Sequence, residues 1–296
     1  MSKTIVITGC STGFGRESAL RFARRGDRVY ATMRAVEGKN AERAAALRAE
    51  AKDEKLTLTV LELDVCDTAS VEGAAKVVEG ESGAPDVVIN NAGVMYVGVT
   101  EAFDPSELTA QLDVNVVGVH RVCRAFLPAM RAANRGLIIN VSSVAGRLAI
   151  PTFGIYQASK WALEGYSASL RYELASSGVD VVLVEPGPFR TELFGQSPAP
   201  KDSEGRAATY PAEFTSAMEA MGSMFETVLS DPEAPTDPAL VVDLFVELTD
   251  MNAGSRPLRK TVGLDFGVED YNQPTIEFDA SVLAAMNLTS ATRIRG

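Results

Sequence analysis

The sequence predicts an α/β fold in which one doubly wound parallel sheet carries helices on both faces. Short runs of β-branched and apolar residues alternate with segments of helical periodicity, which is typical of parallel strands joined by helical crossovers. The first run ends in a glycine-rich turn that leads directly into a helix. With 296 residues, of which 46% are hydrophobic and 23% charged, the chain is long enough to bury a full core as one large domain.

The overall charge and the cysteine content argue against several classes of function. A net charge of -11 disfavours a nucleic-acid partner and adhesion to anionic lipid. Cys10, Cys66 and Cys123 have neither the number nor the spacing of a disulfide framework or a metal site. The chain passes from Met1 into its first strand without an apolar segment long enough for export or for a membrane span. We therefore expect a soluble, cytoplasmic protein without a metal.

The first predicted strand covers residues 3–8 and stops at Gly9. A helix follows and ends at Gly26, and the turn between them reads Thr8-Gly9-Cys10-Ser11-Thr12-Gly13-Phe14-Gly15. The glycines permit a tight turn and the close approach of a ligand. Because the amino end of a helix adds unpaired N–H groups and a partial positive charge, this turn suits a pyrophosphate.

The second predicted strand, residues 28–32, ends in Met33-Arg34. At this position an acidic side chain would hydrogen-bond the ribose of NAD, whereas an arginine accommodates the 2′-phosphate of NADP. Arg34 therefore favours NADP(H) over NAD(H), with Ser11 and Thr12 as further donors to the same phosphate. The alternative is that Arg34 is an ordinary solvated surface charge.

The next predicted elements are a helix over residues 40–52 and strands over residues 57–63 and 86–89. Asp64 follows the first of these strands, and Asp67 or Thr68 is suited to cap the helix after it. The second strand delivers Asn90-Asn91-Ala92-Gly93 at its carboxyl end, where an α/β sheet binds ligands.

A long helix is predicted from Pro105 to Ala133. It contains Asn115 flanked by valines, and a polar side chain in such a position must be hydrogen-bonded if it is buried. The sole histidine, His120, has no cluster of partners that would make it a base, so we interpret it as structural.

The strand predicted over residues 136–141 places Ser142 and Ser143 at its carboxyl end, before a helical segment that contains Tyr156 and Lys160. Residues four apart share a helix face, so the lysine ammonium can reach the tyrosine hydroxyl. A nearby cation favours phenolate and lowers the phenol pKa from about 10, which makes a usable acid or base. A nucleophilic serine is disfavoured, because no suitable His and Asp partners are evident.

Together these motifs resemble the short-chain dehydrogenase/reductase family, in its subgroup with a Thr-Gly-x-x-x-Gly-x-Gly loop and a Tyr-x-x-x-Lys motif. The resemblance covers roughly residues 3–195 and a late strand near residue 262, and the environment after Lys160 is somewhat similar to hydroxysteroid and retinol dehydrogenases. It implies a Rossmann-type sheet with strand order 3-2-1-4-5-6-7. It also implies reversible hydride transfer between a nicotinamide and a carbonyl compound or its alcohol.

The same resemblance assigns roles to individual residues. Tyr156 donates a proton to the carbonyl oxygen and Ser143 hydrogen-bonds that oxygen, while Lys160 lowers the tyrosine pKa and binds the nicotinamide ribose. Asn115 bends its helix and holds a water that continues a proton path, and Asn90 braces the central strands. The residues expected to bind the dinucleotide are Gly9, Ser11, Thr12, Gly13, Phe14, Gly15, Arg34, Asp64, Val65, Asn91, Ala92, Gly93, Tyr156, Lys160, Pro186, Gly187, Phe189 and Thr191.

The last third of the chain is expected to cover the substrate. After a strand over residues 179–185, a mobile loop is expected at 196–205. An apolar stripe at helical spacing then consists of Phe214, Met218, Met221, Phe225 and Val228. This stripe is either a lid over an apolar substrate or an ordinary core-facing stripe. Asp237-Pro238 begins a helix through Leu248, a last strand covers residues 260–264, and residues 274–288 form one more helix, packed on the body or on a neighbouring subunit.

We therefore expect one domain over residues 1–296, with a substrate-covering insertion at 195–230 and a carboxyl-terminal extension at 266–296. The expected function is NADP(H)-dependent interconversion of an apolar ketone or aldehyde and its alcohol, in a homodimer or homotetramer. Two alternatives are an epimerase or dehydratase and a non-catalytic nucleotide sensor or scaffold on the same fold. Intact Ser143, Tyr156 and Lys160 argue against the sensor.

Overall fold

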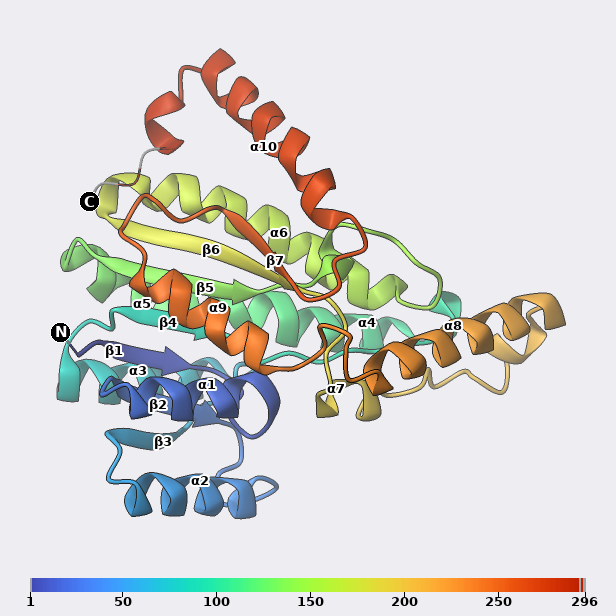
Figure 1. Ribbon diagram of the computed structural model, residues 1–296, viewed down its shortest axis with the longest axis horizontal. Coiled ribbons are helices and arrows are strands. Elements are labelled where there is room, and N and C mark those ends of the chain that lie inside the picture. The colour runs from blue at the N-terminus through green and yellow to red at the C-terminus, as the bar shows by residue number, and fades with distance from the viewer. Residues whose placement is uncertain (1, 293, 295–296) are drawn as a thin grey trace.

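A parallel sheet forms the centre of the molecule in the computed structural model, which describes residues 2–292 and 294 (Figure 1). Its strands are β1 (Thr4–Ile7), β2 (Arg28–Met33), β3 (Leu58–Glu62), β4 (Val87–Asn90), β5 (Gly136–Val141), β6 (Val179–Pro186) and β7 (Arg259–Val262). They lie in the order β3-β2-β1-β4-β5-β6-β7, and each neighbouring pair is parallel. The predicted fold class and strand order are confirmed.

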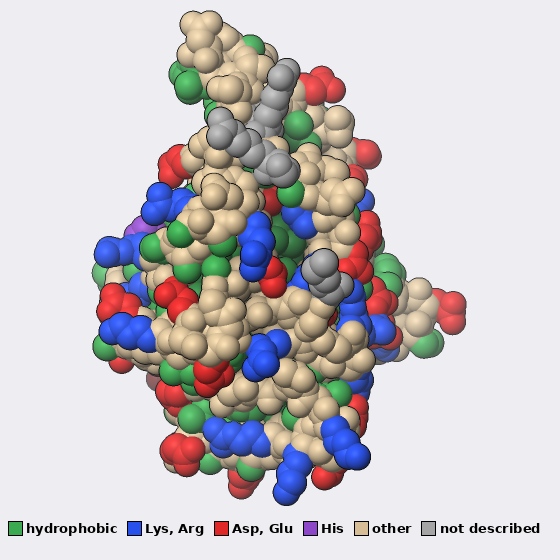
Figure 2. All heavy atoms as spheres, turned by 90° about the vertical axis from the view of Figure 1, so that its left-hand side faces the viewer, with side chains coloured by type: hydrophobic (Ala, Val, Ile, Leu, Met, Phe, Trp, Pro, Cys, Tyr) green, Lys and Arg blue, Asp and Glu red, His purple; other side chains and the backbone are tan. Residues whose placement is uncertain are grey.

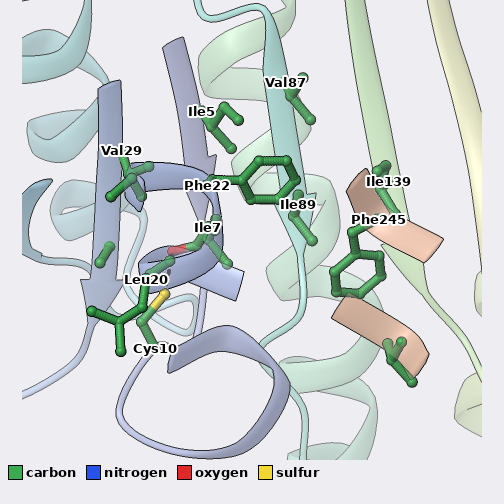
Figure 3. Close-up of a cluster of buried hydrophobic side chains, with 14 of the residues drawn as sticks. Ile5, Ile7, Cys10, Leu20, Phe22, Val29, Val87, Ile89, Ile139 and Phe245 are labelled. Atoms are coloured by element: carbon green, nitrogen blue, oxygen red, sulfur yellow. Dashed lines mark hydrogen bonds between the residues drawn. The ribbon is translucent and has the colours of Figure 1, made fainter. Parts of the chain in front are cut away.

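Helices cover both faces of the sheet. They are α1 (Gly13–Arg24), α2 (Ala41–Asp53), α3 (Thr68–Ser82), α4 (Pro105–Leu112), α5 (Gly118–Ala132), α6 (Gly154–Leu174), α7 (Glu192–Gly195), α8 (Ala212–Ser230), α9 (Ala239–Asp250) and α10 (Val268–Ala285). Side chains of α1, α2 and α9 pack into one apolar cluster, and side chains of α3, α5 and α6 pack into a second on the other face. In Figure 3, Phe22 of α1 and Phe245 of α9 lie against Ile5, Ile89 and Ile139 of the sheet. This double coverage explains why the strands read as continuous apolar runs.

The long helix predicted from Pro105 to Ala133 is interrupted. A turn of π-helix at Asp113–Val117 separates α4 from α5, and Asn115 lies within this turn. π-Turns inside helices are frequent at functional sites.

At the start of α3, the Asp67 carboxylate accepts the N–H of Ala69 at 2.9 Å, so the predicted cap of α3 is confirmed.

The carboxyl-terminal elements differ in their limits from the prediction. The predicted start of α10 at Pro274 is wrong: the helix begins at Val268 and accommodates the proline in its interior. Its first half packs on the body through Val268 and Asn272, and the remainder projects outward (Figure 1). α9 begins at Ala239, whose N–H is accepted by the Asp237 carboxylate at 2.9 Å. Residues 1, 293, 295 and 296 of the predicted domain and extension lie outside the described residues.

Strand direction determines which side of the molecule carries the ligand-binding edge. Figure 2 shows the side at which the strands begin, where acidic and basic side chains are interspersed. The carboxyl ends of the strands, with α7 and α8 beyond them, lie on the opposite side (Figure 1).

Within residues 2–292 and 294, every helix is too short or too polar to cross a bilayer.

Candidate active site

A cavity of about 580 Å³ lies at the carboxyl edge of the sheet. It continues from the turn after β1, past the ends of β2 to β5, to the loop after β6 and to α8. The predicted site residues that line it are Gly9, Ser11, Thr12, Gly13, Phe14, Arg34, Asp64, Val65, Asn91, Ala92, Gly93, Ser143, Tyr156, Lys160, Pro186, Gly187, Phe189 and Thr191. Gly15 and Asn115 are not among the lining residues. The topology thus brings together residues that are far apart in the sequence.

Glycines at positions 9 and 13 give the turn after β1 its conformation. Gly9 has φ +74°, and a Cβ there would lie 2.8 Å from the Cα of Ala92. Gly13 has φ +54°, also in the left-handed region that favours glycine. At Gly15 a Cβ would clash with the Gly9 carbonyl and with the side chain of Asn91, and the predicted contact of Gly15 with a dinucleotide stays a prediction. Gly15 keeps the turn tight and does not line the cavity.

Thr8, which is absent from the predicted site residues, joins the glycine turn to the end of β4. Its hydroxyl oxygen accepts the N–H groups of Asn91 and Ala92, each at 3.0 Å. The Asn91 side chain donates to the Thr8 carbonyl at 2.9 Å. Asn90 donates to the Asn140 side chain of β5 at 2.8 Å, so it links the central strands as expected. These bonds hold the floor of the cavity in place.

Basic side chains gather at the β2 end of the cavity. Arg34 lines it together with Lys39 and Arg43, which the sequence reasoning missed. Both come from the start of the helical segment after β2, so their basic charge near a helix start was the available signal. The acidic Glu62 is already engaged, since its carboxylate accepts the N–H groups of Ala35 and Val36, both at 2.7 Å.

Asn115 binds the protein itself. Its side-chain amide donates to the Val94 carbonyl at 2.9 Å and to the Ser159 hydroxyl at 3.0 Å, and its oxygen accepts the Val94 N–H at 2.9 Å. The side chain therefore clamps the segment after β4 to α6. A π-turn is present at this residue, whereas its roles in bending the helix and in holding a water stay predictions.

Tyr156 and Lys160 lie side by side on α6 and face the same cavity. The lysine Nζ is 5.6 Å from the centroid of the tyrosine ring and donates to the Val141 carbonyl at 2.9 Å. Both side chains are buried, each with 6% of its surface exposed. Ser143 completes the group from the end of β5, where its hydroxyl accepts the N–H of Ala145 at 3.1 Å.

Burial dominates the acid–base properties of this group. It raises the pKa of Tyr156 from 10.0 to about 12, and a hydrogen bond with Ser143 acts in the opposite direction. Burial also lowers the pKa of Lys160 from 10.5 to about 8, although the nearby Glu164 carboxylate raises it. Both shifts have the same cause, because a low-dielectric environment disfavours the charged form of each group.

The expected lowering of the Tyr156 pKa by Lys160 is therefore not seen in the protein alone. Desolvation of the phenolate outweighs the attraction of an ammonium whose own charge is weakened by burial. The expectation considered the lysine charge and left out the cost of removing both groups from water.

An apolar wall closes the cavity opposite the glycine turn. Met95, Ala145 and Phe153 form a buried cluster with Tyr156, and α8 packs Met221 and Phe225 against it. α8 buries none of its residues completely. Two residues of the apolar stripe, Met221 and Phe225, therefore line the cavity, and they do not join the two clusters that pack on the sheet.

Other reactive groups do not form a site. Cys10, Cys66 and Cys123 are unpaired thiols, and burial raises the pKa of each. Among residues 2–292 and 294, no cluster of His, Cys, Asp or Glu side chains could hold a metal ion. His120 is exposed at the surface, with its Nδ1 3.2 Å from the Tyr166 hydroxyl.

Sequence comparison relates most of this architecture to known enzymes. The family model described as short chain dehydrogenase matches residues 3–202. 3-Ketodihydrosphingosine reductase of Bacteroides thetaiotaomicron is 39% identical over 208 residues, which cover 67% of this chain and 72% of that protein. Retinol dehydrogenase 8 of Bos taurus is 39% identical over 197 residues, which cover 66% of this chain and 61% of that protein. The chain thus matches less than two thirds of the length of the second relative.

Solved structures share the fold over most of the chain. A short-chain dehydrogenase from Streptomyces avermitilis superposes with a TM-score of 0.72 at 30% identity and covers 97% of this chain and 98% of its own. A gluconate 5-dehydrogenase from Burkholderia cenocepacia, in complex with NADP and tartrate, gives 0.69 at 27% identity with coverages of 91% and 96%. A Burkholderia phymatum protein in complex with NAD gives 0.71 at 25% identity and 88% of both chains. Nicotinamide dinucleotides of both kinds are therefore bound on this fold.

The burial of Lys160 predicts a gain in stability when its charge is removed. Lys160→Met is expected to raise the free energy of unfolding at pH 7 by about 1 to 3 kcal/mol, because the lowered lysine pKa measures the cost of burying the ammonium. Below a pH of about 8 the folded and unfolded states are both protonated, so the full cost is present there. It disappears as the pH rises from about 8 to 10.5.

Chemical denaturation of both proteins at pH 7 and at pH 10 measures this difference. A methionine variant that is less stable than the unaltered protein at pH 7 would contradict the prediction. So would a difference that does not shrink at the higher pH.

Proposed function

The chain belongs to the short-chain dehydrogenase family, and from this premise we propose that it is an NADP(H)-dependent oxidoreductase that interconverts an apolar ketone or aldehyde and its alcohol. The observation that carries the proposal is the shared cavity. The glycine turn, Ser143, Tyr156 and Lys160 all line one continuous space at the carboxyl edge of the sheet.

The residues present fit a dinucleotide. The turn from Gly9 to Gly13 lines the cavity, its two glycines have positive φ, and it leads into the amino end of α1, which favours a pyrophosphate. Lys160 would bind the nicotinamide ribose, and the loop with Pro186, Gly187, Phe189 and Thr191 would border the nicotinamide. When bound, the dinucleotide supplies or accepts a hydride.

The protein contributes proton transfer and positioning. In the reductive direction Tyr156 donates its phenolic proton to the carbonyl oxygen, and Ser143 hydrogen-bonds the same oxygen. Lys160 has a pKa of about 8, so it exchanges protons near neutral pH and can return one to the phenolate. The apolar wall excludes water, which strengthens each of these electrostatic interactions.

The preference for NADP(H) rests on the charge at the β2 end of the cavity. Arg34, Lys39 and Arg43 would surround a 2′-phosphate, with Ser11 and Thr12 as additional donors. Arg43 also pairs with Glu192 at 2.8 Å, so Arg34 and Lys39 are the basic side chains proposed to make the main contacts with the phosphate. These contacts support NADP(H) more than NAD(H).

An apolar substrate is supported by the wall that includes Met95, Phe153, Met221 and Phe225. The retinol and ketodihydrosphingosine enzymes among its relatives are named for apolar substrates, in line with this wall.

Residues 195–230 are proposed as the substrate-covering insertion of one domain that spans the chain. The unpaired thiols support a reducing compartment, the cytoplasm, and a homo-oligomer follows from the family by analogy.

Arg34→Ala tests the cofactor preference. Loss of a charge-assisted hydrogen bond of about 1.5–3 kcal/mol is expected to raise KM for NADPH about 10- to 100-fold and to leave KM for NADH nearly unchanged. Arg28→Ala, at the opposite end of β2, is the matched control. NADPH and NADH oxidation is followed by absorbance with aliphatic, aromatic and steroidal ketones. A preference for NADH in the unaltered protein would refute the role of Arg34, and oxidation of neither cofactor would favour a nucleotide sensor.

Tyr156→Phe tests the catalytic role directly. The ring is retained while the proton donor is lost, so turnover is expected to fall at least about 100-fold. Dinucleotide binding, measured by calorimetry, should survive. Tyr172→Phe on the same helix controls for removal of a partly buried phenol. Retention of turnover by the Tyr156 variant would exclude the tyrosine as the proton donor.

A further inference from the structure

A buried cluster of charged side chains lies directly behind the candidate active site. Glu164 follows Lys160 by one turn of α6, and Arg259 of β7 donates through Nε to Glu164 Oε2 at 2.8 Å. Glu185 of β6 approaches the same Nε, with its Oε1 at 3.8 Å. Lys160, Glu164, Glu185 and Arg259 are 6%, 2%, 0% and 8% exposed. Two carboxyl groups therefore share one guanidinium in a region without water access.

The two oxygens of Glu164 have different surroundings. Oε2 is bound by Arg259, whereas Oε1 is buried without a hydrogen-bond partner among the described residues. The point where a Cβ on Gly146 would lie is 3.3 Å from this Oε1 and 2.9 Å from the Ser142 hydroxyl oxygen. Ser142 directly follows Val141, whose carbonyl accepts the Lys160 ammonium. The unpaired oxygen of Glu164 and Ser142, the residue after the acceptor of the Lys160 ammonium, therefore both lie next to Gly146.

We propose that Glu164 is a positioning residue for Lys160: its buried carboxylate keeps the ammonium charged and in place beside Tyr156. The functional consequence rests on the proposed role of Lys160 in proton transfer. The electrostatic claim itself concerns the protein alone, and it holds or fails without any ligand.

The charges of the cluster agree with this role. Burial lowers the pKa of Lys160, and Glu164 opposes that effect. Burial, and then repulsion from Glu164, raise the pKa of Glu185 to about 8. Glu185 is therefore protonated at neutral pH, and Asn272 of α10 donates to its Oε2 at 2.6 Å. Glu164 keeps the bond to Arg259.

Other charged groups on elements packed against α6 already have partners. Asp180 on β6 pairs with Arg171 at 2.7 Å, Asp113 in the π-turn pairs with Arg121 at 2.8 Å, and Arg147 donates to Asn272 at 2.7 Å. Glu107 on α4 accepts the Asp104 N–H at 2.8 Å. Glu164 lies one turn from Lys160 on the same face of α6.

Carbon-13 NMR of protein labelled at the lysine ε-carbons tests the proposal on the unliganded protein. The Lys160 resonance is assigned by its loss in Lys160→Met, and its titration midpoint is then followed in Glu164→Gln. Removal of the opposite charge one helical turn away is expected to lower that midpoint by about 1 pH unit. Glu164→Asp, which keeps the charge, should restore it. Glu185→Gln, in the same cluster but mimicking the protonated acid, should leave it unchanged.

The pH profile of kcat/KM gives the functional readout. If charged Lys160 is required, activity is lost as the pH rises through its pKa, and Glu164→Gln moves this loss to lower pH. A midpoint of Lys160 that is equal in Glu164→Gln and in the unaltered protein would overturn the proposal and would leave Glu164 as an anchor for Arg259. Should that variant not fold, Glu164→Met with Arg259→Met replaces both partners by apolar groups, and the same lowering is expected.

Discussion

The burial of Tyr156 and Lys160 in one apolar cavity is the constraint on which the site depends. Outside water, the neutral form of each group has a lower free energy than the charged form. Burial therefore raises the pKa of the phenol and lowers the pKa of the ammonium. The structure offsets part of this cost with the Val141 carbonyl, the Ser143 hydroxyl and the carboxylate of Glu164. A buried pair of this kind lowers the stability of the protein, and the proposed acid–base function would account for its presence.

The sheet supplies the positions for this pair. All strands are parallel, so the ends of β1, β4 and β5 meet at one edge and bring the glycine turn, Asn91 and Ser143 to the same cavity. Thr8 and Asn90 then join neighbouring strand ends by hydrogen bonds. The π-turn at Asn115 extends the same network to α6 through Ser159. Residues that do not line the cavity therefore determine its geometry.

Local signals in the sequence were sufficient for most elements of the fold and for many of the residues that line the cavity. Apolar runs, glycine turns and helix caps are properties of neighbouring residues, and the strand order follows from the family resemblance. Features that depend on distant segments were not predicted. Three features require knowledge of the tertiary structure: the pairing of Glu164 with Arg259, the basic side chains of Lys39 and Arg43 in the cavity, and the direction in which the pKa of Tyr156 shifts. The start of α10 was predicted at Pro274 because proline is disfavoured in the interior of a helix, whereas this helix begins at Val268 and contains the proline.

The pKa of the Tyr156 phenol tests the account most directly. Carbon-13 NMR of protein labelled at the tyrosine ζ-carbons, with the resonance assigned from Tyr156→Phe, gives this value with and without NADP⁺. The account predicts a midpoint near 12 in the protein alone and a lower one when NADP⁺ is bound, because its nicotinamide ring carries a positive charge. A midpoint at or below the ordinary value of about 10 in the protein alone would contradict the claim that burial controls this tyrosine.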